Sequence, residues 1–147
     1  MIREWTVKEA QTDMRVANFM KAFEGATNFV KVDSDYTFKR YMKLMEDGIC
    51  RIFIAEEGEN LQGAIGFIIS SDLHDGAKTA IETFWFVHPD YKGIGKELFN
   101  TFEIDAKCMG CTKLAMIHLS DSYPESLQRF YIRNGYKLLE KHYVKEI

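Results

Sequence analysis

Apolar residues in the first part of the chain recur at the spacing of a helix. Two groups follow positions i, i+3, i+4 and i+7: Val16, Phe19, Met20 and Phe23, then Phe38, Tyr41, Met42 and Met45. This spacing places each group on one face of an amphipathic helix. Gly25 and Gly48 follow the two groups and are suited to end the helices, because glycine readily adopts the conformation found beyond helix ends.

The middle of the chain changes to the alternation and β-branched content that are typical of strands. The stretches "CRIFIAEE" and "QGAIGFIIS" flank "GEN", which predicts a hairpin, and "TAIETFWFV" predicts a third strand nearby. Shorter strands are expected over residues 2–7 and in "KLAMIHL". The segment "YKLLEKHYVKEI" is expected to finish the chain in strands.

Two more helices are predicted in the second half of the chain. One covers residues 95–109, and the other opens at a capping box formed by Ser122 and Glu125 and ends at Gly135. The order of elements is β-α-α-β-β-β-α-β-α, followed by one or two strands. It predicts one domain over residues 1–147, of the α/β class, with a mixed, mostly antiparallel sheet of six or seven strands flanked by four helices.

Composition and charge exclude several classes of protein. Hydrophobic residues make up 46% of the chain and the formal net charge is −3, which fits a globular domain and argues against the basic field of a nucleic-acid partner. No apolar run reaches the ~18 residues of a membrane span, and the first residues lack the apolar core of a signal peptide. We therefore expect a cytoplasmic protein with neither nucleic acid nor membrane as a partner.

Three cysteines occur, an odd number that favours reduced thiols. Cys108 and Cys111 form a C-x-x-C, but no second pair completes a zinc site. The pair lies at the end of a predicted helix, with Gly110 beyond it, where the helix dipole disfavours a thiolate. Structural cysteines are therefore favoured over a metal or redox role, and no metal is expected.

The stretch "HPDYKGIGKEL" joins a predicted strand to a predicted helix. Free amide groups at a helix N-terminus bind anions, and glycine lets the backbone approach a phosphate without a Cβ in the way. Lys92 and Lys96 add positive charge beside Gly93 and Gly95. The alternative is a tight turn that needs glycine for its geometry alone.

Neither common phosphate motif fits this turn. Asp90 stands where a P-loop needs its first glycine, and Leu98 stands where a dinucleotide fingerprint needs its third. The stretch "FVHPDYKGIGKELF" instead resembles motif A of the GNAT-type N-acetyltransferase superfamily, V-x-P-x-[YF]-R-G-x-G-[IV]-G-x-x-L. The later stretch "SLQRFYIRNGYKLLEKHYVK" resembles a second family motif, F-Y-x-x-x-G-[FY]. With the same order of elements, the resemblance covers nearly the whole chain.

The resemblance implies that the glycine turn binds the pyrophosphate of acetyl-coenzyme A (acetyl-CoA). It also implies that strand backbone pairs with the pantetheine arm of the cosubstrate as an added strand would. The residues that match these cofactor-binding positions are Trp85, Val87, Lys92, Gly93, Ile94, Gly95 and Lys96.

The resemblance also suggests two catalytic residues. Tyr131 matches the tyrosine of the second motif, which implies a general acid for the departing thiolate, although it shares a helical face with Phe130 and core packing is the alternative. Glu82 is the acid within "AIETFWFV", and alternation puts it on one face with Phe84 and Phe86. Apolar neighbours should raise its pKa and make it a candidate general base, with a solvent-facing strand edge as the alternative. His88 and His118 are favoured as structural histidines.

The amine acceptor is expected near "FEGATNFVKVDSDYTF", the region where the family admits it. Acids and aromatic rings in this region would suit a cationic amine, although a solvated loop is the favoured interpretation. The residues concerned are Glu24, Phe29, Asp33, Asp35 and Tyr36. The resemblance thus implies an N-acetyltransferase that acts by direct attack in a ternary complex on a small-molecule or peptide amine, and a homodimer by analogy.

Two departures from the family pattern keep a second function open. The glycine loop is shorter than the usual R-G-x-G-x-G, and Pro124 stands where an asparagine often contacts the cofactor. These departures bear on activity more than on coenzyme A binding. The alternative is a non-catalytic acyl-CoA-binding or interaction module on the same fold. A nucleotide-phosphate enzyme is disfavoured, because no Ser or Thr that could bind a metal follows the glycines.

Overall fold

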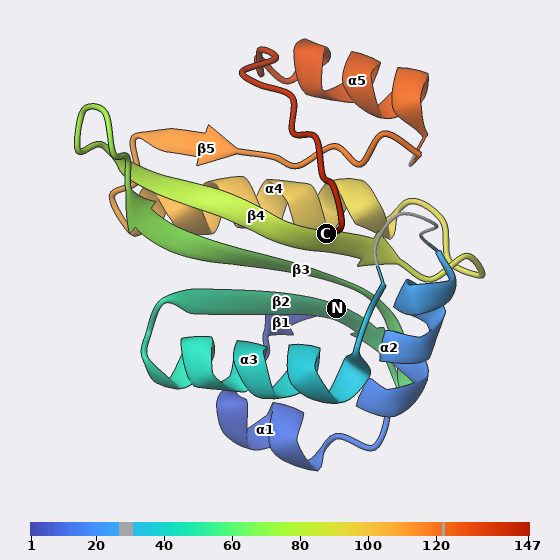
Figure 1. Ribbon diagram of the computed structural model, residues 1–147. Helices are drawn as coiled ribbons and strands as arrows, with labels where there is room; N and C mark the ends of the chain where they lie inside the picture. Colours follow the sequence, from blue (N-terminus) through green and yellow to red (C-terminus); the bar gives the residue numbers. More distant parts are fainter. Residues whose placement is uncertain (27–30, 122) are drawn as a thin grey trace. The chain divides into compact units, whose positions relative to one another are not determined.

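The computed structural model describes residues 1–26, 31–121 and 123–147. These residues form two compact units, Met1–Ile117 and His118–Ile147 (Figure 1). The first unit holds the sheet and α1 to α4, and the second holds α5. None of the helices in the described part of the chain has the length and apolar run that a bilayer crossing requires.

The elements largely follow the predicted order. In the first unit they are β1 (Ile2–Glu4), α1 (Val7–Thr12), α2 (Val16–Gly25), α3 (Ser34–Glu46), β2 (Cys50–Glu57), β3 (Asn60–Ser71), β4 (Lys78–Val87), α4 (Ile94–Cys108) and β5 (Lys113–Ala115), and α5 (Pro124–Arg133) lies in the second unit. The hairpin between β2 and β3 is confirmed, with Gly58 at a φ of 58° in its turn. The end of α4 is also confirmed, because Gly110 follows its cap at a φ of 81°.

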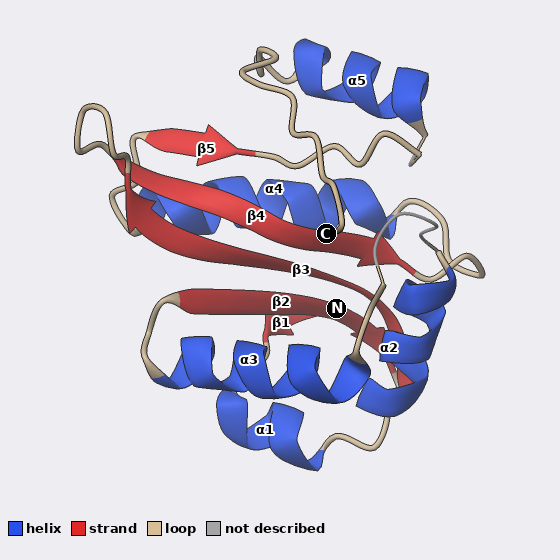
Figure 2. Ribbon diagram, viewed as in Figure 1, coloured by secondary structure: helices blue, strands red, loops and turns tan. Residues whose placement is uncertain are grey.

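The sheet is mixed and mostly antiparallel, as predicted. Its strand order is β1-β2-β3-β4-β5, and only the β4–β5 pair is parallel among the described strands. Helices α1, α2 and α3 cover one face and α4 covers the other (Figure 2). The first face buries a cluster that includes Phe19 and Met42, and the second buries Phe67 with Leu98 and Phe102 of α4.

The predicted number of helices was wrong, because the described residues contain five rather than four. The additional helix is α1, which begins where a strand over residues 2–7 was expected. Thr6 and Glu9 form a capping box: the Glu9 N–H donates to the Thr6 hydroxyl at 3.3 Å, and the Thr6 N–H donates to the Glu9 carboxylate at 3.1 Å. This box satisfies free amides of the first turn and ends the strand at Glu4.

The predicted number of strands was also wrong, because the described residues contain five rather than six or seven. Residues 136–147 form no strand, and apolar side chains there, such as Leu139 and Val144, are exposed. The strand expected in "KLAMIHL" is limited to Lys113–Ala115. A strand exists only where its backbone bonds to a neighbour, and the apolar content of a segment does not supply that neighbour.

Helix α5 begins at Pro124, with Tyr123 as the residue before it. Ser122 lies outside the described residues, so its predicted capping role stays a prediction. The residue before the helix is Tyr123, at a left-handed φ of 46° and with no side-chain hydrogen bond to the helix. Pro124 takes the first helical position, which suits proline because that N–H would have no helical partner. The predicted end of α5 is confirmed by Gly135, at a φ of 86°.

Strand β4 contains one residue more than the strand it pairs with. Phe67 of β3 is opposite Glu82, and the next residue, Gly66, is opposite Phe84. Thr83 therefore falls between two paired positions, as the extra residue of a β-bulge does. The bulge reverses the alternation of side chains along β4 at this point.

The ring of Phe84 lies over Gly66, the glycine opposite it. A Cβ on Gly66 would be 2.2 Å from Cε1 of Phe84 and 2.8 Å from Cδ1. Both distances are far below contact range, so any side chain at position 66 would displace the ring. The glycine therefore makes room for a ring that packs edge-on against Tyr41 of α3, at 5.3 Å between ring centroids.

We expect Gly66→Ala to lower the free energy of unfolding by ~1–3 kcal/mol, because the added methyl overpacks the site under Phe84. Urea unfolding of the purified variant measures this change. The matched control is Gly25→Ala, since Gly25 lies in α2 and a Cβ there meets nothing within 4 Å. Equal stability of Gly66→Ala and the parent protein would contradict the packing described here.

Candidate active site

Strands β4 and β5 part close to Glu82. Their parallel pairing runs from Thr79 opposite Lys113 to Ile81 opposite Ala115 and stops there. Beyond it, the backbone N–H of Ile117 donates to the Glu82 carboxylate at 2.8 Å. The carboxylate thus accepts an N–H in the segment that follows the end of the ladder.

Glu82 is buried, with only 3% of its surface exposed. Burial raises the pKa of Glu82 to about 7, and the hydrogen bond from Ile117 opposes the rise. The predicted direction of this pKa shift is confirmed, and the alternative of a solvent-facing position is wrong. The carboxyl group can therefore exchange a proton near neutral pH, which an ordinary exposed glutamate does not do.

The predicted face of Glu82 was wrong. The bulge at Thr83 separates Glu82 from Phe84 and Phe86, so strict alternation does not continue between them. Phe84 and Phe86 belong to the cluster under α1 to α3, whereas Glu82 is paired with Phe67, whose ring packs against α4. Burial of the carboxyl group is therefore the cause of the raised pKa, and a face shared with Phe84 and Phe86 is not.

Tyr41 is a neighbour of Glu82 that the sequence did not identify. Burial raises the pKa of Tyr41 to about 12, the Thr83 hydroxyl opposes the rise, and the charges of Cys50 and Glu82 add to it. The sequence placed Tyr41 only on the apolar face of a helix. Its position near Glu82 depends on how α3 packs on the sheet, which no local pattern specifies.

The glycine turn follows β4 directly and leads into α4. Gly93 precedes the helix at a φ of 91°, with no side-chain cap, and a Cβ there would meet nothing within 4 Å. The first amides of the helix therefore have no capping side chain, and the space beside Gly93 is open. Lys92 and Lys96 are exposed on either side. These features fit the predicted anion site.

Gly95 has a different role from Gly93. A Cβ on Gly95 would lie 3.3 Å from Cγ2 of Val87 and 3.5 Å from Cζ2 of Trp85. The missing side chain thus lets α4 pack closely on β4. As predicted, Trp85 and Val87 share one face of the strand, since both pack against the cluster that contains Leu98.

Tyr131 lies in the second unit, on α5. It is 8% exposed, and it contacts the rings of Tyr136 at 5.8 Å, Phe130 at 6.0 Å and His118 at 6.1 Å within that unit. The ring contact with Phe130 accords with the core-packing alternative. His88 is in the first unit, with its Nδ1 at 3.5 Å from a carboxylate oxygen of Asp90. The predicted roles of these residues stay predictions.

Most of the acids expected around the acceptor are directed to solvent or to helix caps. Glu24 and Asp35 are exposed, and so is Tyr36, at 68%. Asp33 caps α3 by accepting the N–H of Tyr36 at 2.9 Å. Phe29 lies outside the described residues. The described acids of this segment are thus solvent-exposed, but Asp35 and Tyr36 belong to α3 and not to a loop.

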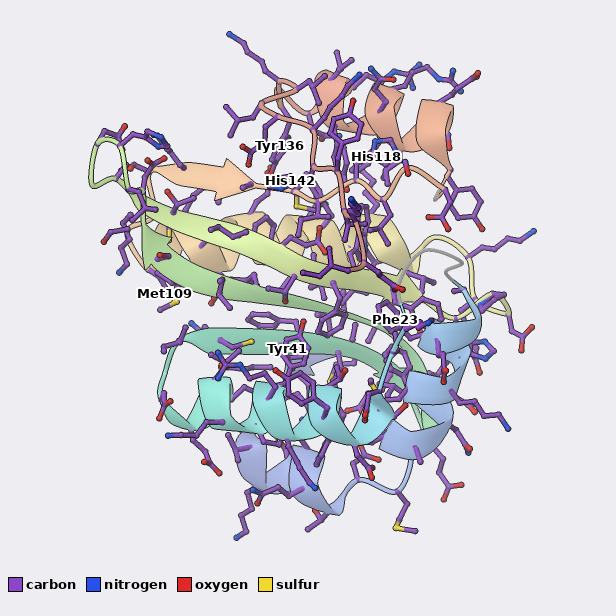
Figure 3. The ribbon with its side chains drawn as sticks, viewed as in Figure 1. Phe23, Tyr41, Met109, His118, Tyr136 and His142 are labelled. Atoms are coloured by element: carbon purple, nitrogen blue, oxygen red, sulfur yellow. The ribbon has the colours of Figure 1, made fainter. Side chains whose placement is uncertain are left out.

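A cavity of about 220 Å³ opens between the sheet and helices α2 and α3. Thr83 and Phe84 of β4 line the cavity on the side of the sheet. Phe23 and Tyr41 line it on the side of the helices (Figure 3). The described residues that line it are Trp5, Val16, Phe19, Met20, Phe23, Lys31, Val32, Thr37, Phe38, Tyr41, Met42, Ile52, Ala64, Thr83 and Phe84.

The cysteines show no sign of a metal or redox site. All three are free, Cys108 is exposed, and burial raises the pKa of the Cys111 thiol. Within the described ranges, no three or more His, Cys, Asp or Glu residues gather in a group that could hold a metal ion. The raised pKa argues against a thiolate at this position.

Comparisons with known proteins extend these observations. The model of the acetyltransferase (GNAT) family matches residues 16–136. Comparison of the sequence with curated proteins found no match. Among solved structures, a ribosomal-protein-alanine N-acetyltransferase from Brucella melitensis biovar Abortus 2308 superposes with a TM-score of 0.74 at 19% identity, covering 100% of this chain and 98% of that one. An aminoglycoside acetyltransferase from an uncultured soil metagenomic sample, in complex with sisomicin, gives 0.74 at 15% identity, with 100% and 96% covered.

We expect the buried Glu82 to make stability depend on pH. Its pKa is raised in the folded state, so folding favours the protonated form, and this contribution is complete at low pH and is lost as pH rises through about 7. The loss amounts to about 3 kcal/mol, because folding raises the pKa from 4.5 to about 7. Urea unfolding between about pH 5 and pH 8 measures it.

The control for this pH dependence is Glu82→Gln, which keeps the size of the side chain and removes its titration. The variant should lose the extra pH dependence of the parent protein across that range. Carboxylates with lowered pKa values, such as Asp13 and Asp72, titrate below it and affect both proteins alike. Parallel pH profiles for parent and variant would show that Glu82 titrates normally.

Proposed function

The chain belongs to the acetyltransferase (GNAT) family, and on that basis we propose that it transfers an acetyl group from acetyl-CoA to a primary amine. The amine attacks the thioester directly, within a ternary complex. The observation that carries this proposal is the buried Glu82, with a pKa of about 7, at the point where β4 and β5 part. The same strand leads into the glycine turn before α4.

Because the family match runs over residues 16–136, it includes parts of each unit. This supports the proposal that residues 1–147 form one acetyltransferase domain.

Glu82 is the proposed general base. An alkyl amine such as that of lysine has a pKa near ~10.4 and must lose a proton before it attacks. A carboxylate that titrates near neutral pH accepts that proton better than an exposed glutamate, and enough of it is ionised at pH 7 to act. Glu82 takes the proton directly or through one water molecule. The new bond forms between the amine nitrogen and the acetyl carbon.

Tyr131 is the proposed general acid. As the bond between the acetyl carbon and sulfur breaks, the departing thiolate needs a proton, because thiols have a pKa near ~8.5. A phenol with an ordinary pKa near ~10 can donate it. Tyr131 is then restored by solvent, and the proton held by Glu82 also returns to solvent. No cysteine is required by this direct route.

The cosubstrate is proposed to lie along β4 and over the glycine turn. Backbone groups at Trp85 and Val87 pair with the pantetheine arm in the manner of an added strand. The amides that follow Gly93 and the charges of the two lysines hold the pyrophosphate. The complete proposed set in the turn is Lys92, Gly93, Ile94, Gly95 and Lys96. The open space beside Gly93 fits a phosphate in contact with the backbone.

A non-catalytic acyl-CoA-binding module on the same fold is the second candidate. The short loop and Pro124, in the place of the asparagine, favour it. Burial of Glu82 disfavours it, because a carboxyl group with a raised pKa costs stability when ionised and gives no benefit to simple binding. Turnover of an amine distinguishes the two candidates.

We expect the double variant Lys92→Glu/Lys96→Glu to bind acetyl-CoA ~10–100-fold more weakly, because each reversal removes a charge-assisted contact to phosphate. Isothermal titration calorimetry measures the affinity. The matched control is Lys8→Glu/Lys39→Glu, which makes the same change of charge at exposed positions on α1 and α3. Equal weakening in both variants would mean that net charge, and not the turn, determines binding.

We expect Glu82→Gln and Tyr131→Phe each to lower kcat by ~10²–10⁴-fold while leaving acetyl-CoA affinity unchanged, since each removes one proton-transfer group. A thiol-release assay with a turned-over amine measures kcat. In the parent protein kcat/KM should rise with pH to a plateau above about 7, and Glu82→Gln should lack this limb. Acetyl-CoA binding without turnover of any amine would favour the binding module.

A further inference from the structure

The cavity beside β4 has mostly apolar walls, whereas a site for a cationic amine would be expected to carry acidic side chains. Aromatic rings dominate it: Phe84 packs edge-on against Tyr41 at 5.3 Å and against Phe23 at 6.1 Å. Among its described lining residues, the single charged side chain is Lys31. No described carboxylate lines the cavity, so nothing on its described walls would pair with an ammonium group.

Several polar groups at this cavity can donate a hydrogen bond. Trp5 is 6% exposed, and its indole Nε1 is buried with no hydrogen-bond partner among the described residues. A buried donor without a partner costs free energy, and a ligand oxygen within reach would recover it. Tyr41 keeps its proton because its pKa is raised to about 12, so its hydroxyl can also donate. Lys31 adds positive charge at the same cavity.

The cavity is close to the proposed base. Thr83 lines it and is the chain neighbour of Glu82, and the charge of Glu82 contributes to the raised pKa of Tyr41. A ligand whose body fills the cavity would have its attached amine at the Thr83 end, one residue along β4 from Glu82. Apolar walls favour the neutral form of that amine, which is the form that attacks an acetyl group.

The volume of the cavity suits an aromatic side chain. Its size is about 220 Å³, whereas a dry apolar cavity of ~150 Å³ is enough to bind benzene. A benzyl group with a few further atoms therefore fits, whereas a multi-ring sugar does not, and the apolar walls disfavour a polyamine, which would bring several charges. The size and the apolar surface select the same class of ligand.

We propose that this cavity is the acceptor subsite and that the acceptor is an α-amine next to a carbonyl, carrying an aromatic or large apolar side chain. The side chain fills the ring-lined cavity, and the carbonyl or carboxylate oxygen accepts from Trp5 Nε1 or interacts with Lys31. This chemistry occurs in a free hydrophobic amino acid and in the first residue of a peptide. The inference rests on the proposed acetyl transfer and specifies its acceptor.

Calorimetry without cosubstrate tests the subsite separately from the reaction. The ligands are L-phenylalanine, L-phenylalaninamide, L-alaninamide and spermidine, and a phenylalanyl dipeptide amide represents a peptide terminus. We expect L-phenylalaninamide to bind at least ~10-fold more tightly than L-alaninamide, from the additional apolar area buried. Tighter binding of spermidine than of L-phenylalaninamide would overturn the proposal. Preference for the dipeptide amide over L-phenylalanine would identify the source as a peptide.

Two variants locate the binding. Ala64 is 1% exposed and lines the cavity, so Ala64→Leu fills it and should weaken L-phenylalaninamide binding at least ~10-fold while acetyl-CoA affinity stays the same. Lys31 is exposed, so Lys31→Gln should fold normally. This variant should bind L-phenylalanine about threefold more weakly and bind L-phenylalaninamide with unchanged affinity, because only the first ligand has a carboxylate that can form a partly exposed ion pair with Lys31. The control for this charge is Lys39→Gln, on α3 and outside the cavity lining.

The outcomes separate the two proposals. If the parent protein does not bind acetyl-CoA, the proposed acetyl transfer is wrong and no acceptor can be assigned. Acetyl-CoA binding with turnover of spermidine and none of L-phenylalaninamide would keep the acetyl transfer and overturn the subsite. Unchanged L-phenylalaninamide binding in a folded Ala64→Leu variant, checked by its thermal melt, would also overturn it.

Discussion

The extra residue in β4 determines the character of both parts of the candidate site. With Thr83 inserted between paired positions, Glu82 stays in register with Phe67, while Phe84 is directed to the face under the helices. A strand without the bulge would place the acid and the rings on the same side. Neighbouring positions of β4 can thus supply both the carboxylate of Glu82 and the apolar wall at Phe84, and the carboxylate does not line the cavity. The glycine opposite Phe84 makes this arrangement sterically feasible.

The functional interpretation depends on a balance of burial and hydrogen bonding at Glu82. Complete withdrawal from water would keep the carboxyl group protonated, and full exposure would make it a weak base. One backbone N–H, from Ile117, leaves the pKa between these limits. That donor lies just beyond the last β4–β5 pair, Ile81 opposite Ala115. The short strand and the titration of the acid therefore belong to the same local geometry.

Local patterns in the sequence predicted the features that depend on local spacing. The helix faces, the β2–β3 hairpin, the glycine turn and the burial of an acid in β4 could all be expected. The capping box of Thr6 and Glu9 also has a local signature, T-V-K-E, although a strand was predicted over residues 2–7. The face of Glu82 could not be predicted, because the extra residue is defined only against β3. The neighbourhood of Tyr41 likewise depends on contacts between elements that are distant in the sequence. The apolar residues at the end of the chain predicted strands that did not form, because a segment's composition does not show whether a neighbouring strand is there to pair with it.

The two tryptophans of the chain stand at different parts of the candidate site. Trp5 lines the cavity under the helices, whereas Trp85 is in contact range of Gly95 at the start of α4. Each proposed subsite therefore contains its own intrinsic fluorophore. Replacing one indole by phenylalanine would leave emission from the other alone. The order in which two substrates arrive would then be visible as two separate optical signals from an unlabelled protein.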